Sequence, residues 1–201
     1  GSSWVATQVV GDTDPEGVVV FSVTCTDVAG AVTTTTSTTD GSSLAIDRHA
    51  PELSSVSIFS SNLDPSAATA GDTITIRFAT SEGLGEAPHV LIAGQVTSSS
   101  GVAANEFMAT HIVTQADRQG DTTFSVMCQD TAGNRGAVAT TSTDGTSVII
   151  DHQPPELLWV SLESSNRDSA IAMADDQITL SLTVTEPLQS APDVFILGVR
   201  S

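Results

Sequence analysis

Residues 21–30 read Phe-Ser-Val-Thr-Cys-Thr-Asp-Val-Ala-Gly, and residues 124–133 read Phe-Ser-Val-Met-Cys-Gln-Asp-Thr-Ala-Gly. The shift from position 21 to position 124 is 103 residues. Further phrases return at a shift of 104: Thr39-Asp40-Gly41 as Thr143-Asp144-Gly145, and Ser60-Ser61-Asn62 as Ser164-Ser165-Asn166. A fixed period of one small-domain length indicates a tandem array. Such arrays usually provide reach, multivalency or stiffness rather than chemistry.

Aligning the copies sets their phase along the chain. Pro51-Glu52-Leu53 aligns with Pro155-Glu156-Leu157, and Trp4–Thr7 aligns with Phe107–Thr110. We therefore expect one complete unit over residues 51–154. Residues 1–50 are then the C-terminal half of an earlier unit, and residues 155–201 the N-terminal half of a later one, so the chain reads as a segment of a longer array.

Alternation of apolar and polar residues predicts an all-β fold. Ile74, Ile76 and Phe78 alternate with polar residues, and no stretch shows the 3.6-residue period of a helix. Clusters of Gly, Asp, Asn and Ser separate the apolar runs. The predicted strands of the complete unit lie near residues 54–60, 72–80, 88–94, 95–99, 106–113, 122–129 and 136–150, and the last of these is expected to be interrupted. Seven such strands are typical of an immunoglobulin-like (Ig-like) β-sandwich, here repeated about every 104 residues.

The two predicted half units each carry too few strands to cover their own apolar face. Three sources of cover remain open: neighbouring chains, further sequence of the same protein, or the two halves completing each other. Because residues 155–201 hold the first strands of a unit and residues 1–50 the last, head-to-tail joining of identical chains would rebuild a sandwich at each junction. A contact of this kind propagates into a filament.

Composition excludes several classes of function. Six Arg, no Lys and 24 acidic residues give a net charge of −18, which disfavours binding to nucleic acid or to an anionic membrane. No apolar run is long enough to span a bilayer. Gly-x-Ser-x-Gly, His-Glu-x-x-His and phosphate-binding glycine loops are all absent from the sequence. We therefore expect a protein that is not an enzyme, and neither nucleic-acid binding nor membrane insertion by this segment.

Several phrases in order carry a family resemblance. They are Asp-x-Ala-Gly-Asn at 130–134, Asp-x-x-x-Pro at 47–51 and 151–155, Gly-Asp-x-Ile-Thr at 71–75, and Ser81-Glu82. The pattern resembles the Ig-like repeats of large cell-surface proteins, which include bacterial giant adhesins and surface fibrils or flagellar hairs of algae and protists. The resemblance implies an extended, non-catalytic stalk or fibre outside the cell. The chain departs from the pattern at Ala31, which aligns with Asn134, and at Asp175, which aligns with Gly71.

Calcium is the metal that the acidic residues suggest. In a sandwich of this type the incoming linker meets two loops at one end, where carboxylates from several segments could supply the oxygen ligands that Ca²⁺ needs. The resemblance supports this, because related adhesin repeats stiffen their linkers with calcium. The candidate ligands are Asp47, Glu52, Glu82, Asp130 and Asn134 at one junction, and Asp151, Glu156 and Glu186 at the next. The alternative is that Asp130 caps a turn and that Asp47 and Asp151 bind linker amides.

Two cysteines and two hydroxyl-rich runs are further candidates for modification. Cys25 and Cys128 occupy aligned positions and have no expected partner within a unit, so each is either a small buried residue or a half of an intermolecular disulfide. The candidate O-glycosylation sites are Thr33, Thr34, Thr35, Thr36, Ser98 and Ser99. No Asn-x-Ser/Thr sequon exists in the sequence.

The sequence thus predicts a structural segment of an extracellular filament, stalk or surface fibre that assembles end to end with copies or other segments of the same long chain. The first alternative is an adhesin module that binds carbohydrate or another cell surface. The second is an accessory domain of a secreted enzyme. No cofactor is expected, apart from the calcium considered above.

Overall fold

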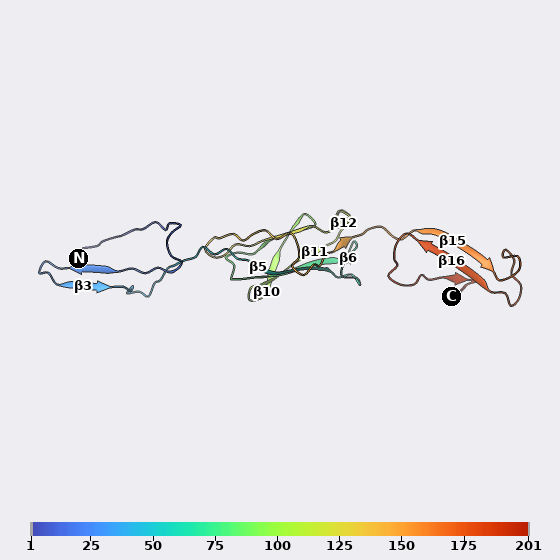
Figure 1. Cartoon of the computed structure of the whole chain (residues 1–201), viewed down its shortest axis with the longest axis horizontal. Helices are drawn as coiled ribbons and strands as arrows, with labels where there is room; N and C mark the ends of the chain where they lie inside the picture. The colour runs from blue at the N-terminus through green and yellow to red at the C-terminus, as the bar shows by residue number, and fades with distance from the viewer. Residues whose placement is uncertain (1, 201) are drawn as a thin grey trace. The chain divides into compact units, whose positions relative to one another are not determined.

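The computed structural model describes residues 2–200 and shows β-strands and no helix among them, which confirms the all-β prediction (Figure 1). The chain divides into two compact units, residues 1–151 and residues 152–201. Each unit is described by itself below. No helix that is long and apolar enough to cross a membrane occurs in the described part of the chain.

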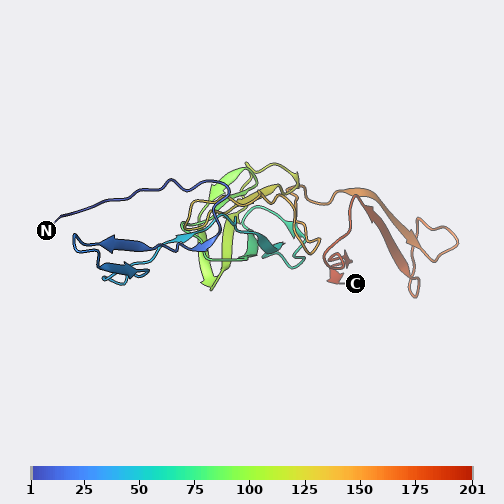
Figure 2. The same ribbon diagram turned by 60° about the vertical axis from the view of Figure 1, so that its left-hand side comes forward.

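The first fifty residues form two short antiparallel pairs. Strand β1 (Gly17–Val18) pairs with β4 (Ala45–Ile46), and β2 (Val23–Thr26) pairs with β3 (Val32–Thr35). These hairpin strands and the long extended stretch before them are visible in Figure 2. Residues 2–10 belong to no strand.

Residues 51–151 contain the most extensive β-structure. One antiparallel sheet has the order β10-β11-β7-β5, with β5 at Leu53–Ser60, β7 at Thr73–Thr80, β10 at Ser99–Ala103 and β11 at Glu106–Ile112. A second has the order β13-β8-β9, with β8 at His89–Ile92, β9 at Gln95–Thr97 and β13 at Phe124–Met127. A small third sheet has the order β12-β14-β6, with β6 at Ala67–Ala68, β12 at Gly120–Asp121 and β14 at Ile149–Ile150. β14 and β6 run parallel to each other, and the other pairs are antiparallel.

A single apolar core joins these sheets. Ile76 and Phe78 of β7, Val90 of β8 and Val126 of β13 are each at most 2 % exposed. The alternation of the strand sequences places these side chains on the inner faces, and residues such as Arg77 of β7 and His89 of β8 on the outer faces. An apolar layer between two antiparallel sheets is the arrangement of a β-sandwich.

The unit of residues 152–201 contains two separate pairs. β15 (Leu157–Ser164) pairs with β16 (Ile178–Val184), and β17 (Phe195–Ile196) pairs with β18 (Val199–Arg200). The first pair repeats the β5–β7 ladder 104 positions later, from Leu53↔Thr80 and Leu157↔Val184 to Ser60↔Ile74 and Ser164↔Ile178. The irregularity after Leu53 also returns after Leu157.

Other features recur in the same way. The β17–β18 pairing repeats the β8–β9 pairing, and the β1–β4 pairing repeats the β12–β14 pairing. The turn Ala93-Gly94 has positive φ angles of 52° and 78°, and Leu197-Gly198 has 51° and 77°. Each outer segment, residues 1–50 or residues 152–201, therefore repeats part of the local structure of residues 51–151, although the segments differ in how well their strands are covered.

Candidate functional site

Asp130 caps a turn of residues 51–151 near the linker, which is the stretch of residues 47–51 that leads into this segment. Its Oδ1 accepts hydrogen bonds from the backbone N–H groups of Gly133 (2.7 Å) and Asn134 (2.8 Å), and its Oδ2 accepts one from the Asn134 amide (2.8 Å). Burial raises the pKa of Asp130, but the hydrogen bonds from Asn134 and Gly133 outweigh burial and hold the pKa below its ordinary value. Asp130 therefore caps the turn, which is the role that the sequence offered as the alternative to calcium binding.

Asp27, which aligns with Asp130, makes a similar but exposed turn. Its Oδ1 accepts hydrogen bonds from the N–H groups of Ala29 (2.9 Å) and Ala31 (2.8 Å). Because Ala31 has no side-chain amide, the bond that Asn134 donates to Asp130 has no counterpart in this turn. Both turns therefore share the bond to the backbone N–H four residues on, at Ala31 or Asn134, whereas the side-chain bond belongs to the Asp130 turn.

Glu82 reaches this turn because its loop packs closely against the chain at Asp130. Leu84 and Asp130 form a backbone bridge, and the Gly85 N–H donates to the Gln129 carbonyl at 3.1 Å. A Cβ atom on Gly85 would lie 2.5 Å from the Asp130 carbonyl oxygen, so only glycine permits this approach. The Thr80 hydroxyl donates to the Glu82 carbonyl at 2.7 Å and fixes the start of the loop.

Asp47 approaches from the linker. The Asn134 amide donates to the Asp47 carbonyl oxygen at 3.1 Å, and the Asp47 carboxylate accepts from the His49 N–H at 3.1 Å. Asn134 thus links the linker to the Asp130 turn. Gly136, two residues further on, passes so close to the linker that a Cβ atom there would lie 2.2 Å from the Pro51 carbonyl oxygen.

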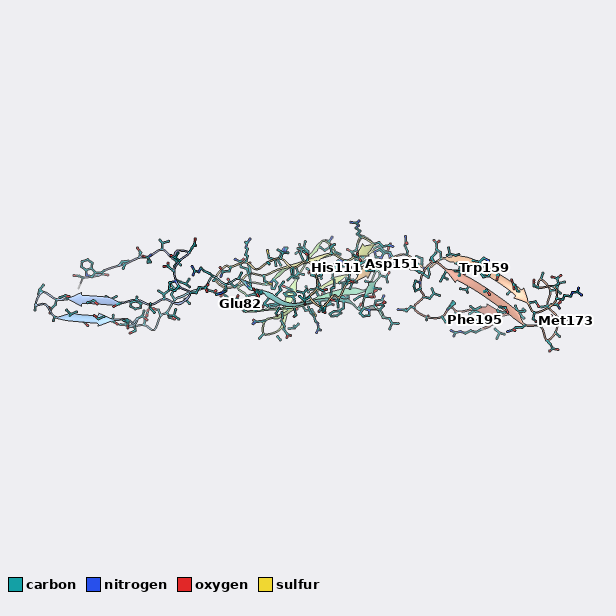
Figure 3. The ribbon with its side chains drawn as sticks, in the orientation of Figure 1. Glu82, His111, Asp151, Trp159, Met173 and Phe195 are labelled. Atoms are coloured by element: carbon teal, nitrogen blue, oxygen red, sulfur yellow. The ribbon has the colours of Figure 1, made fainter. Side chains whose placement is uncertain are left out.

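Asp47, Glu82 and Asp130 together form the acidic cluster. Each offers one carboxylate oxygen, and the three oxygens lie within 4.8 Å of one another. Asp130 is buried, Glu82 is partly buried and Asp47 is exposed. Figure 3 labels Glu82 at this end of residues 51–151. Such a group could offer oxygen ligands to a cation, or it could remain a set of turn-capping and solvated carboxylates.

The remaining predicted ligands lie in different surroundings. Glu52 is exposed, and its backbone N–H donates to the Ser81 hydroxyl at 3.0 Å; its carboxylate is not among the three oxygens of the acidic cluster. Glu156 and Glu186 line one shallow cavity of about 340 Å³ in the unit of residues 152–201. Asp151 belongs to the other unit, and its backbone N–H donates to the Ala68 carbonyl at 2.8 Å.

A second cluster of charged residues is not indicated by any motif in the sequence. Glu16, Asp47 and His49 also bring one ligand atom each to within 4.8 Å of one another, and all three are exposed. Glu16 accepts from the Arg48 N–H at 2.9 Å and lies 2.8 Å from His49 Nδ1. Glu16 is far from the linker in sequence, so only the β1–β4 pairing, which returns the chain to it, could have indicated this contact.

The predicted modification sites differ in exposure. Cys128 is buried in the core, and burial raises the pKa of its thiol, whereas Cys25 is exposed. Thr33, Thr34, Thr35 and Thr36 are exposed, as is Ser98. Ser99 is partly buried, and its hydroxyl donates to the Pro88 carbonyl at 2.9 Å. Glycosylation at these positions stays a prediction.

Apolar side chains on strands are exposed in the two outer segments, residues 1–50 and residues 152–201. Val160 and Leu162 on β15 are 50 % and 63 % exposed, whereas the aligned Val56 and Ile58 on β5 are 1 % and 2 % exposed. Val23 on β2 is 49 % exposed, whereas the aligned Val126 is fully buried. The same residue types in the same strands are thus core in one segment and surface in the others.

In comparisons with known proteins, no family model matches the chain, and no match was found among curated proteins or among solved structures.

Proposed function

We propose that this chain is a structural segment of an extracellular filament, stalk or surface fibre, built from Ig-like units that repeat about every 104 residues and that assemble end to end. One observation carries the proposal. Residues 152–201 repeat the β5–β7 and β8–β9 pairs of the middle segment, residues 51–151, and residues 1–50 repeat its β12–β14 pair, yet only the middle segment has a buried core. Strands of this kind are stable when neighbouring material covers them, which is how repeat arrays derive their stability.

The role is mechanical rather than catalytic. A β-sandwich resists extension because its strands must separate from their ladders, and the linkers set the angle between successive units. Pro51 and the Pro154-Pro155 pair have fixed φ angles, which limits bending of the linkers. The partners of such a segment are neighbouring copies or other segments of the same long chain.

The strongly acidic composition is compatible with this role. A net charge of −18 keeps an exposed fibre soluble and disfavours binding to nucleic acid or to anionic membranes. The acidic cluster of Asp47, Glu82 and Asp130 lies where the linker enters the middle segment, so calcium bound there would stiffen this linker. The proposed structural role does not depend on calcium.

Electron microscopy of the source cells tests the proposed function. Antibodies raised against residues 51–151 should label regular filaments outside the cell that have a constant axial repeat. Single flexible rods ending at the surface of another cell would favour an adhesin stalk instead. Label confined to the cell interior would contradict the extracellular location.

A further inference from the structure

The unit of residues 152–201 presents an apolar face with no cover among the residues described. Eight buried core residues of the middle segment belong to its N-terminal half, from Val56 to Ile92, and all eight aligned positions are apolar. None of the eight is buried. They are Val160, Leu162, Ala172, Ile178, Leu180, Leu182, Val194 and Ile196.

The first fifty residues present the opposite half of the same core. Seven buried core residues of the middle segment belong to its C-terminal half, from Ala109 to Ile150, and all seven aligned positions are again apolar and not buried. They are Ala6, Val10, Phe21, Val23, Cys25, Leu44 and Ile46. One end of the chain therefore carries the complement of the apolar face at the other end. Phe78 becomes the smaller Leu182 and Val148 becomes the larger Leu44, and these changes partly offset each other in volume.

The open strand edges match as well. In the middle segment β7 has β5 on one side and β11 on the other, whereas β16 has only β15. Residues 3–9 align with β11 and belong to no strand. Their backbone groups can therefore add to the free edge of β16, as β11 adds to β7, with Trp4 opposite Leu182 just as Phe107 is opposite Phe78.

A preformed turn supplies a third match. In the middle segment the Thr143 hydroxyl accepts a hydrogen bond from the Val56 N–H on β5 at 2.9 Å. The Thr146 hydroxyl accepts one from the Ile58 N–H at 2.9 Å. The aligned turn at residues 39–42 is already formed: Asp40 accepts from the Ser42 N–H at 3.0 Å, as Asp144 accepts from Thr146 at 3.0 Å. Gly41 and Gly145 have φ angles of 76° and 77°. The turn thus has the geometry to bind the aligned edge of β15.

We infer that residues 157–200 of one copy of this chain bind residues 3–46 of a second copy, in the strand register that the middle segment shows within itself. This inference rests on the proposed end-to-end assembly and adds its partner surface and its register. Residues 21–24 then pair antiparallel with residues 193–196, so that Ser22 lies opposite Phe195 and Thr24 opposite Asp193, as Ser125 lies opposite Leu91 and Met127 opposite His89. The contact joins unlike surfaces, so it adds copies in a line.

The linker end of this junction cannot copy the middle segment. Gly136 and Gly85 pass too close to neighbouring backbone to carry a Cβ atom, and the aligned residues are Thr33 and Gln189. The backbone must therefore separate further at that end. The inferred register is confined to the strands, and the experiment uses positions on them.

Disulfide mapping in the 201-residue chain tests the register. Two differently tagged chains, both carrying Cys25→Ala, are mixed and oxidised mildly. Ser22→Cys on one chain should bond to Phe195→Cys on the other, and Thr24→Cys to Asp193→Cys, because directly opposite residues have Cβ atoms about 5 Å apart. The two crossed combinations, Ser22→Cys with Asp193→Cys and Thr24→Cys with Phe195→Cys, are the matched controls. The residues of each crossed pair would be diagonal neighbours about 7–8 Å apart, too far for a disulfide without backbone movement.

The outcomes separate the inference from the function on which it rests. Bonding of the two direct pairs well above the crossed pairs supports the inferred register. Equal bonding of all four pairs in chains that associate overturns the register and leaves end-to-end assembly standing. Bonding only within one chain that carries both Ser22→Cys and Phe195→Cys indicates a closed monomer and overturns the inference. Chains that stay monomeric in sedimentation velocity at high concentration contradict both the inference and end-to-end assembly of this chain.

The native thiols give a second readout that needs no substitution. Cys25 is exposed in the single chain, and assembly in the inferred register buries it as Cys128 is buried. Its reaction with a maleimide should therefore slow by about tenfold or more when the chains associate, while Cys128 stays unreactive throughout. Association without protection of Cys25 would overturn the inferred contact, even if the cysteine variants failed to fold.

Discussion

Asp130 is buried and accepts three hydrogen bonds, so its replacement should lower the stability of the whole middle segment. We expect Asp130→Ala to lower the melting temperature of residues 51–151 by several degrees, because two backbone N–H groups lose their acceptor. Asp27→Ala is the matched control, since that carboxylate caps an exposed turn and should leave this transition unchanged. Circular dichroism during heating measures both variants, and equal shifts would contradict the distinction.

Acid should destabilise the middle segment for the same reason. Hydrogen bonds hold the pKa values of Asp130 and Asp144 below the ordinary value of 3.8. Asp117 is likewise lowered: burial raises its pKa, but bonds from Thr114 and His111 outweigh burial. A lowered folded-state pKa gives stability that is complete above 3.8 and is lost as the pH falls through the folded-state value. The melting temperature should thus be flat between about pH 5 and 7 and fall below about pH 4. A fall that begins near pH 6 would contradict this assignment to the aspartates.

Calcium binding at the acidic cluster is decided by a melting assay. If Asp47, Glu82 and Asp130 hold Ca²⁺, millimolar calcium should raise the melting temperature above that in chelator, because a ligand that binds only the folded state stabilises it. Glu82→Gln should abolish the rise, whereas Glu106→Gln on β11 should leave it intact. Identical melting in calcium and in chelator would leave these carboxylates as turn caps and solvated charges.

At the scale of the strand, substitutions at aligned positions should reduce the unfolding free energy by different amounts in different segments. Ile76 is fully buried in β7, and Ile76→Ala should cost about 2–5 kcal/mol of unfolding free energy. Leu180 aligns with Ile76 but is only partly buried, so Leu180→Ala should cost less than about 1 kcal/mol in the single chain. Urea unfolding followed by the labelling of Cys128 reports on the middle segment. Equal effects of the two substitutions on this labelling would contradict the assignment of a separate core.

Most strands were predictable because their alternation is strong. The structure places β5 at Leu53–Ser60, β7 at Thr73–Thr80 and β11 at Glu106–Ile112, within a residue or two of the sequence prediction. The last strand, predicted over residues 136–150 with an interruption, is shorter than expected: only Ile149–Ile150 lie in a strand, and Ala139 forms an isolated bridge with Val126. Within the predicted strand, the hydroxyls of Thr143 and Thr146 accept hydrogen bonds from backbone N–H groups of β5. These side-chain bonds replace the backbone ladder that the alternation implies.

The exposed strands lacked a usable signal. Strand β10 at Ser99–Ala103 is rich in small residues and mostly exposed, and the chain crosses to the other sheet between β9 and β10. The members of the acidic cluster were predictable from the phrases Asp-x-Ala-Gly-Asn at 130–134, Ser81-Glu82 and Asp-x-x-x-Pro at 47–51. Its close approach was not, because it depends on Gly85, whose lack of a side chain matters only once the neighbouring backbone is known.

At the scale of the whole molecule, charge and apolar surface act in opposite directions. A net charge of −18 makes two copies repel each other, while the uncovered apolar strands favour contact. Salt shortens the range of repulsion, with a Debye length of about 10 Å at 0.1 M and about 3 Å at 1 M, but weakens burial of apolar surface little. End-to-end association should therefore increase with sodium chloride. Sedimentation velocity between about 0.02 and 0.5 M salt measures the average size of the assemblies. Association that falls with rising salt would show that charge complementarity rather than apolar strand pairing holds the copies together.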